Sequence, residues 1–198
     1  MTDTVSQPEI REVNRIVVRF AGDSGDGMQL TGERFTSASA LFGNDLATLP
    51  EFPAEIRAPQ GTLAGVSAFQ VQVSDHDITT PGDAPNVLVA MNPAALKKEL
   101  SKLEEAGTII VNRDTFEERN LKKAGYEDNP LETGELSGYT LFEVPMTSLT
   151  KEVCKGIEGI KPRDAERSKN FFALGLVSWL YQRPLEPTLD WIEKKFGK

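Results

Sequence analysis

Short β-branched runs alternate with helix-periodic segments along this chain of 198 residues, and that alternation constrains its fold most strongly. The apolar run at 15–21 closes at a glycine, as a buried strand does, and similar runs recur at 86–91, 108–111 and 139–144. Strands separated by helical patterns favour a parallel sheet with right-handed crossovers. The sequence therefore predicts an α/β class, with a Rossmann-like, doubly wound, mostly parallel sheet.

Helices are predicted where apolar residues recur at spacings of three and four. The first follows the opening strand and stops at Gly43, and another begins at Asn92-Pro93, where asparagine can cap and proline suits the first turn. The longest is predicted over 164–181 with Trp179 on its buried side, and the last begins near Thr188 with Leu189 and Phe196 on one face. These helices supply the covering layers of the sheet.

One segment departs from strict alternation of strand and helix. Residues 46–49 favour a short strand, and Phe69, Val71 and Val73 alternate with polar residues, which is typical of a half-exposed strand. Pro59 and Gly61 mark a loop between them. An irregular β-rich segment is therefore expected within the mostly parallel sheet.

Composition and charge exclude several classes of protein. The net charge of −8 disfavours nucleic acid, which requires a basic stripe, and no apolar run is long enough to span a bilayer. A single cysteine, Cys154, and a single histidine, His76, exclude a self-contained iron–sulfur cluster or a Cys/His zinc site. The first 13 residues lack the apolar core of a secretory signal, so they are expected to be a disordered lead to one domain over 14–198 in the cytoplasm.

A glycine-rich loop, Gly22-Asp-Ser-Gly-Asp-Gly27, joins the first strand to the first helix. Its free N–H groups and the helix dipole suit an anion, but Leu30 stands where a dinucleotide fingerprint needs its third glycine. Carboxylates at Asp23 and Asp26 would repel a phosphate, and Asp26 with Gln29 resembles a capping pair. The residues alone leave two alternatives, a ligand loop and a tight turn that binds nothing.

Four blocks together resemble a known family. The first two blocks are Gly22-Asp-Ser-Gly-Asp-Gly-Met-Gln-Leu-Thr-Gly32 and Glu51-Phe-Pro-Ala-Glu-Ile-Arg-Ala-Pro-Gln-Gly61. The other two are the strand with its Asn-Pro element at 87–93 and the segment 167–175 on the long helix. They resemble the gamma domain of 2-oxoacid:ferredoxin oxidoreductases, most closely the N-terminal gamma portion of fused gamma–alpha subunits of the 2-oxoglutarate type. The resemblance covers the chain from about Asn14 onward. Because the fused subunits of this family are longer than this chain, it is expected to be an excised, a truncated or a separately encoded domain.

The resemblance implies an enzyme that converts a 2-oxoacid and coenzyme A to acyl-CoA and CO₂ and passes two electrons to ferredoxin. Thiamine diphosphate and iron–sulfur clusters are implied to lie in partner alpha and beta domains or subunits, so the isolated chain is expected to be inactive, with no catalytic or metal-ligating residue. The gamma domain is implied to shape the coenzyme A site. Its candidate contacts, in this chain's numbering, are Ser24, Gly25, Gly27, Gln29, Arg57 and Asn92.

Each candidate has a plainer alternative. Arg57 would clamp a phosphate or carboxylate, but a surface ion pair with Glu51 or Glu55 is the slightly favoured alternative, and Asn92 could serve only as a helix cap. Two other functions stay open: an assembly module whose loop binds nothing, and a free-standing nucleotide- or flavin-binding protein.

Overall fold

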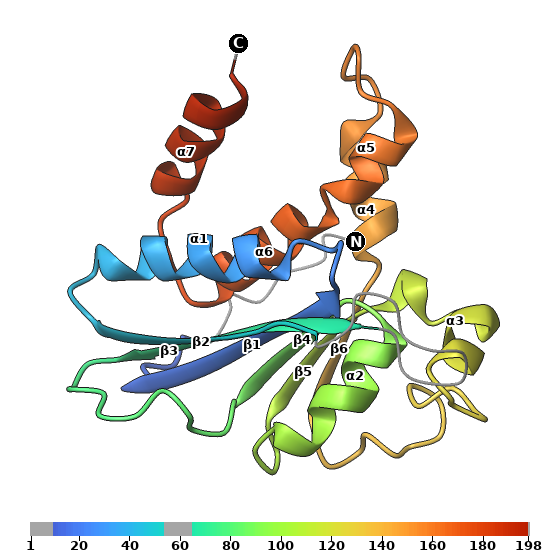
Figure 1. Ribbon diagram of the computed structural model, residues 1–198, viewed down its shortest axis with the longest axis horizontal. Coiled ribbons are helices and arrows are strands. Elements are labelled where there is room, and N and C mark those ends of the chain that lie inside the picture. Colours follow the sequence, from blue (N-terminus) through green and yellow to red (C-terminus); the bar gives the residue numbers. More distant parts are fainter. Residues whose placement is uncertain (1–9, 54–64, 198) are drawn as a thin grey trace, which may run out of the picture.

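The computed structural model describes residues 10–53 and 65–197, and within them six strands form one sheet (Figure 1). The strands are β1 (Arg15–Asp23), β2 (Asp45–Glu51), β3 (Val66–Ser74), β4 (Val87–Ala90), β5 (Thr108–Asn112) and β6 (Thr140–Val144). Their order across the sheet is β2-β3-β1-β4-β5-β6. β1, β4, β5 and β6 pair in parallel, whereas β3 runs antiparallel to both β1 and β2. The predicted mostly parallel sheet with an irregular β-rich segment is confirmed.

Helices cover both faces of this sheet. They are α1 (Met28–Ala40), α2 (Pro93–Glu99), α3 (Glu118–Lys123), α4 (Met146–Cys154), α5 (Pro162–Arg167), α6 (Lys169–Leu180) and α7 (Glu186–Phe196). Two short 3₁₀ segments, η1 (Leu100–Lys102) and η2 (Arg113–Thr115), follow α2 and β5. Figure 1 shows α1 and α6 on one face and α2 and α3 on the other, with α7 projecting away from the sheet. None of the described helices is long and apolar enough to cross a bilayer.

Two apolar clusters fill the spaces between the sheet and these helices. The cluster under α1 and α6 includes Phe20, Phe35, Val71, Val89 and Leu174. The cluster under α2 and α3 includes Ala21, Leu88, Leu96, Ile109 and Leu121. Neighbouring residues of the central strands alternate between the two clusters, as the pleat of a strand requires, so both faces of the sheet are buried at its centre.

Three expectations from the sequence are wrong in detail. All nine residues of β3 are buried, because β3 lies between two strands and its polar residues find partners on the α2 face. The predicted long helix breaks at Ser168 into α5 and α6. Trp179, expected on the buried side of that helix, is 66% exposed. Leu189 and Phe196, for which the sequence indicates only a shared face, are exposed on α7 and lie outside the core.

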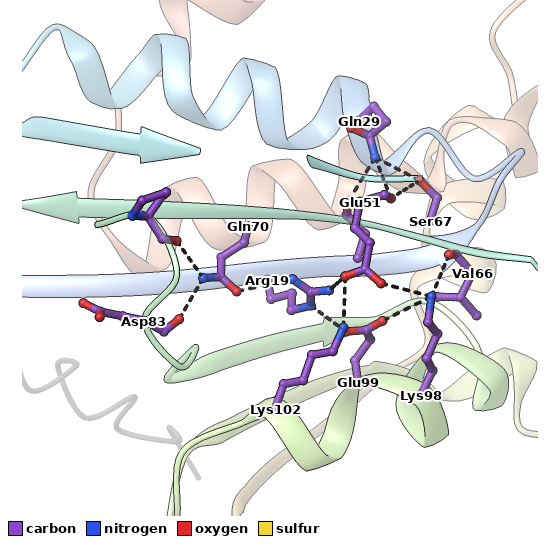
Figure 2. A network of polar contacts seen from close by, with 12 residues as sticks. Arg19, Gln29, Glu51, Val66, Ser67, Gln70, Asp83, Lys98, Glu99 and Lys102 are labelled. Carbon is purple, nitrogen blue, oxygen red and sulfur yellow. Dashed lines mark hydrogen bonds and ion pairs between the residues drawn. The ribbon is translucent and has the colours of Figure 1, made fainter. Parts of the chain in front are cut away.

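A network of charged side chains is buried on the α2 face, where β1, β2 and β3 meet (Figure 2). Arg19 in the middle of β1 is 2% exposed and Glu99 at the end of α2 is fully buried. The Arg19 Nε donates to Glu99 Oε2 at 2.6 Å, and its guanidinium also donates to Glu51 and Gln70. A buried charge is costly unless it is paired and hydrogen-bonded, so Arg19 and Glu99 depend on each other.

Two lysines complete the network at its solvent side. The Lys102 Nζ lies 2.9 Å from carboxylate oxygens of both Glu51 and Glu99, and the Lys98 Nζ lies 3.2 Å from Glu51 Oε1. These contacts join the end of β2 to α2 and η1, which are far apart in the sequence (Figure 2). The network thereby fixes the end of β2 against the centre of the sheet.

Acid should weaken this network through Glu51. Burial by itself would raise the pKa of Glu51, but hydrogen bonds from Lys102, Arg19 and Lys98 outweigh burial and lower the pKa from 4.5 to about 2. Because the folded pKa lies below the unfolded one, Glu51 stabilises the fold above pH 4.5, and that contribution is lost as the pH falls towards 2. Urea unfolding should therefore show a stability difference between the wild type and Glu51→Gln at about pH 6 that shrinks at about pH 3. A difference that does not change with pH would contradict this role.

Candidate functional site

A crevice forms where the connections after β1 and β4 leave the sheet in opposite directions. β1 and β4 are adjacent and parallel, but α1 follows β1 onto one face and α2 follows β4 onto the other. Ligands of open α/β sheets bind in the crevice at such a point, beyond the carboxyl ends of the strands. Asp23 at the end of β1 and Asn92 after β4 both line a cavity there of about 300 Å³.

The cavity is mostly polar and draws its lining from four parts of the chain. Its residues are Asp23, Asp26, Met91, Asn92, Pro93, Ala94, Thr115, Asn120, Lys123, Ala124, Glu166 and Lys169. Of the predicted site residues that the structure describes, Asn92 alone lines it directly. Sequence reasoning missed Lys123 and Lys169, and only the position of Lys169 within the block at 167–175 offered a signal.

Asn92 joins the two strand ends at the floor of the crevice. Its Oδ1 accepts from the Ala95 N–H at 2.8 Å, which confirms the predicted cap of α2, and its Nδ2 donates to Asp23 Oδ1 at 2.9 Å. Burial, and then the nearby charge of Asp26, raise the pKa of Asp23. The Asn92 side chain therefore both caps α2 and lines the crevice.

The glycine-rich loop is held by its own aspartates. The Asp26 Oδ2 accepts from the Asp23 N–H at 3.0 Å, and the Lys169 Nζ lies 3.0 Å from Asp26 Oδ1. The expected capping pair of Asp26 with Gln29 is wrong, because Gly27 is the residue before the helix and no side chain caps α1. Both carboxylates are thus used within the protein, and the loop offers a ligand its backbone.

Glycine is required at the ends of this loop for reasons internal to the chain. A Cβ on Gly22 would lie 2.9 Å from Asp26 Oδ2. Gly27 has a φ of 77°, which side chains rarely adopt, and a Cβ there would lie 2.6 Å from the Asn170 Nδ2. These two positions shape the turn itself.

Gly25 differs, because a Cβ there would meet no atom of residues 10–53 and 65–197 within 4 Å and its φ is not positive. Gly25 and the exposed Ser24 form the tip of the loop. Nothing in the described structure requires glycine at position 25. An open backbone at this tip is what the close approach of a ligand would need.

Gln29 and Arg57 were also predicted to contribute. The Gln29 Nε2 donates to Ala68 O at 2.9 Å, Ser67 Oγ at 3.0 Å and Glu51 O at 3.3 Å, so its amide ties α1 to β2 and β3 (Figure 2). Arg57 lies outside the described residues. No group of three or more potential metal ligands occurs within 10–53 and 65–197.

The sheet defines an α/β domain of the doubly wound class, and its crevice lies where ligands of such sheets bind. Residues 17–198 match the family model "Pyruvate ferredoxin/flavodoxin oxidoreductase", and the chain belongs to that family. Over 191 residues it is 58% identical to the 2-oxoglutarate oxidoreductase subunit KorA of Mycobacterium tuberculosis, a match that covers 96% of this chain but 29% of that protein. The chain thus spans less than a third of this relative.

Two solved structures have the same fold. The 2-oxoglutarate:ferredoxin oxidoreductase from Magnetococcus marinus, with 2-oxoglutarate, coenzyme A and succinyl-CoA bound, superposes with a TM-score of 0.68 at 25% identity over 94% of this chain and 28% of that one. The gamma subunit of a keto/oxoacid ferredoxin oxidoreductase from Geobacter sulfurreducens gives a TM-score of 0.55 at 19% identity over 82% of this chain and 75% of that one, which concerns the fold alone. The resemblance to the gamma domain that the sequence motifs predicted is confirmed.

Proposed function

We propose that residues 14–198 act as the gamma domain of a 2-oxoacid:ferredoxin oxidoreductase and that its crevice receives coenzyme A. The observation that carries the proposal is the open backbone at Gly25, beside a polar cavity at the switch point of the sheet. The likeness to a 2-oxoglutarate:ferredoxin oxidoreductase that binds coenzyme A supports it. The same likeness favours 2-oxoglutarate as the 2-oxoacid.

Under this proposal, some of the predicted site residues would contact coenzyme A and others would hold the elements around the crevice in place. The N–H groups of Ser24, Gly25 and Gly27 would donate to phosphate oxygens, which avoids the carboxylates of the loop. Asn92 would bound the crevice at the end of β4, since its side chain already links Asp23 to α2. Gln29 would act indirectly by holding α1 against β2 and β3. Arg57 is retained as a proposed ionic or interdomain contact.

The reaction itself would be completed by other parts of the enzyme. Thiamine diphosphate would supply the decarboxylation chemistry and iron–sulfur clusters the path for electrons to ferredoxin, both in alpha and beta domains or subunits. The isolated chain would then turn over no substrate, and its place would be the cytoplasm. Exposed apolar side chains of α6 and the following loop, among them Trp179, Leu180 and Leu185, favour a surface that docks on those partners.

A valine at position 25 tests the coenzyme A site in the complete enzyme. Because a Cβ at this position would meet no atom of the described part of the chain within 4 Å, Gly25→Val should leave folding and assembly intact and occupy the space that a ligand needs. We expect the KM for coenzyme A to rise at least about tenfold, the effect of losing roughly 1.4 kcal/mol of binding, with the KM for the 2-oxoacid unchanged.

Gly138→Val is the matched control, because Gly138 also has open space around it and lies outside the residues that line the crevice. It should leave both KM values unchanged. An unchanged KM for coenzyme A in Gly25→Val would favour the alternative, an assembly module whose exposed apolar surface is its main function.

A further inference from the structure

A second cavity, of about 340 Å³, adjoins the crevice at the glycine-rich loop, and we call it the outer cavity. It is lined by Gly25, Asp26, Arg163, Glu166, Arg167 and Lys169. It shares Asp26, Glu166 and Lys169 with the crevice, so one extended ligand could reach into both. Arg163 and Arg167 stand four residues apart on α5 and therefore on the same side of that helix.

Within the part of the chain that the structure describes, the charges around this cavity leave two guanidinium groups without an anion. Asp26 is paired with Lys169 at 3.0 Å. Glu166 is paired with Lys151 at 2.9 Å, and that hydrogen bond lowers the pKa of Glu166. Among the described residues, the side chains of Arg163 and Arg167 have no hydrogen-bond or ion-pair partner, and both are exposed. The cavity thus offers two positive charges next to the open backbone of Gly25.

Two guanidinium groups suit one kind of anion best. Arginine binds phosphate through paired N–H donors, and two arginines match the charge of a dianionic phosphate monoester. Coenzyme A carries one such group, the phosphate on its ribose. Its pyrophosphate is a diester with one charge on each phosphorus and could be held by backbone N–H groups alone.

We propose that Arg163 and Arg167 bind the ribose phosphate of coenzyme A, a role that rests on the proposed function of the crevice. The non-reacting end of the ligand would lie in the outer cavity and the remainder would continue past Gly25 into the crevice. The two arginines then provide the positive charge for binding a phosphate, whereas Asp23 and Asp26 make the glycine-rich loop itself negative.

The test compares coenzyme A with 3′-dephospho-coenzyme A in the complete enzyme. In Arg163→Gln/Arg167→Gln, the KM for coenzyme A should rise at least about tenfold, because charge-assisted contacts to phosphate are lost. The KM for the dephospho compound should change less than about twofold, because it lacks the group that the arginines bind. Arg163→Lys/Arg167→Lys should recover part of the preference for coenzyme A, because the charge remains.

Lys155→Gln/Lys194→Gln is the control for net charge, because it removes two exposed cations that do not line either cavity. It should leave both KM values unchanged. Equal weakening of both compounds in the arginine variant, or no weakening of either, would overturn the assignment to the ribose phosphate. If Gly25→Val raises the KM for coenzyme A while the arginine variant does not, only this assignment fails. If neither variant has an effect, the proposed function fails with it.

Discussion

Replacement of Arg19 by methionine is expected to destabilise the chain by about 3 kcal/mol, because it leaves the buried Glu99 carboxylate without its main partner. Breaking a buried ion pair typically costs about 3–5 kcal/mol, and the lower end applies here because Lys102 remains 2.9 Å from Glu99. Urea unfolding at neutral pH, monitored by far-ultraviolet circular dichroism, measures the loss.

Arg15→Met supplies the matched control on the same strand. Arg15 also forms two ion pairs, with Asp83 at 2.6 Å and Glu104 at 3.2 Å, but its side chain is 34% exposed. Exposed pairs contribute about 0–1 kcal/mol, so Arg15→Met should cost far less than Arg19→Met. Equal losses in the two variants would show that burial of the network has no special energetic role.

Substitution of Gly32 by alanine is the second change with a large expected effect. An added Cβ would lie 2.1 Å from the Phe69 Cδ1 and 2.8 Å from its Cβ, so the whole Phe69 side chain or α1 would have to move. Overpacking of this kind costs about 1–3 kcal/mol, which outweighs the gain of roughly 1 kcal/mol that alanine brings to a helix. A lower urea midpoint with an unchanged slope is the expected result.

Gly175→Ala separates the gain in helix propensity from the cost of overpacking. Gly175 lies inside α6, and a Cβ there meets nothing within 4 Å. Alanine should therefore stabilise the chain by about 0.5–1 kcal/mol through helix propensity alone. The same substitution is thus expected to have opposite signs at the two glycines, and a stabilising effect at Gly32 would contradict the close packing of α1 on β3.

Much of the fold could be predicted because it follows from local patterns. The runs at 15–21 and 108–111, and the cap at Asn92, each depend on neighbouring residues alone, and the structure contains them. The burial of β3 could not be read in this way, since polar Gln70 and Gln72 alternate with apolar residues along it. Their burial depends on partners that other segments supply, such as the Asp83 carbonyl that accepts from Gln70 at 2.8 Å.

The candidate site was predictable only in part for the same reason. The glycine-rich loop and Asn92 follow strands directly, so the topology rule for parallel sheets indicates their common edge. Lys169, Arg163 and Arg167 reach that edge from helices more than a hundred residues further along the chain, and no spacing in the sequence relates them to the loop. The break at Ser168, which separates α5 from α6, is likewise absent from the apolar pattern.

The glycines of the loop also bear on how the sequence can diverge. Gly22 and Gly27 are restricted by atoms of the chain itself, whereas a Cβ on Gly25 would meet none of the described atoms within 4 Å. A relative that kept this fold but lost the ligand would therefore be free to vary at the middle glycine while the outer two stayed fixed by the turn. Under the proposed function, substitutions at position 25 would change the binding of the ligand, whereas those at 22 and 27 would change the stability of the turn.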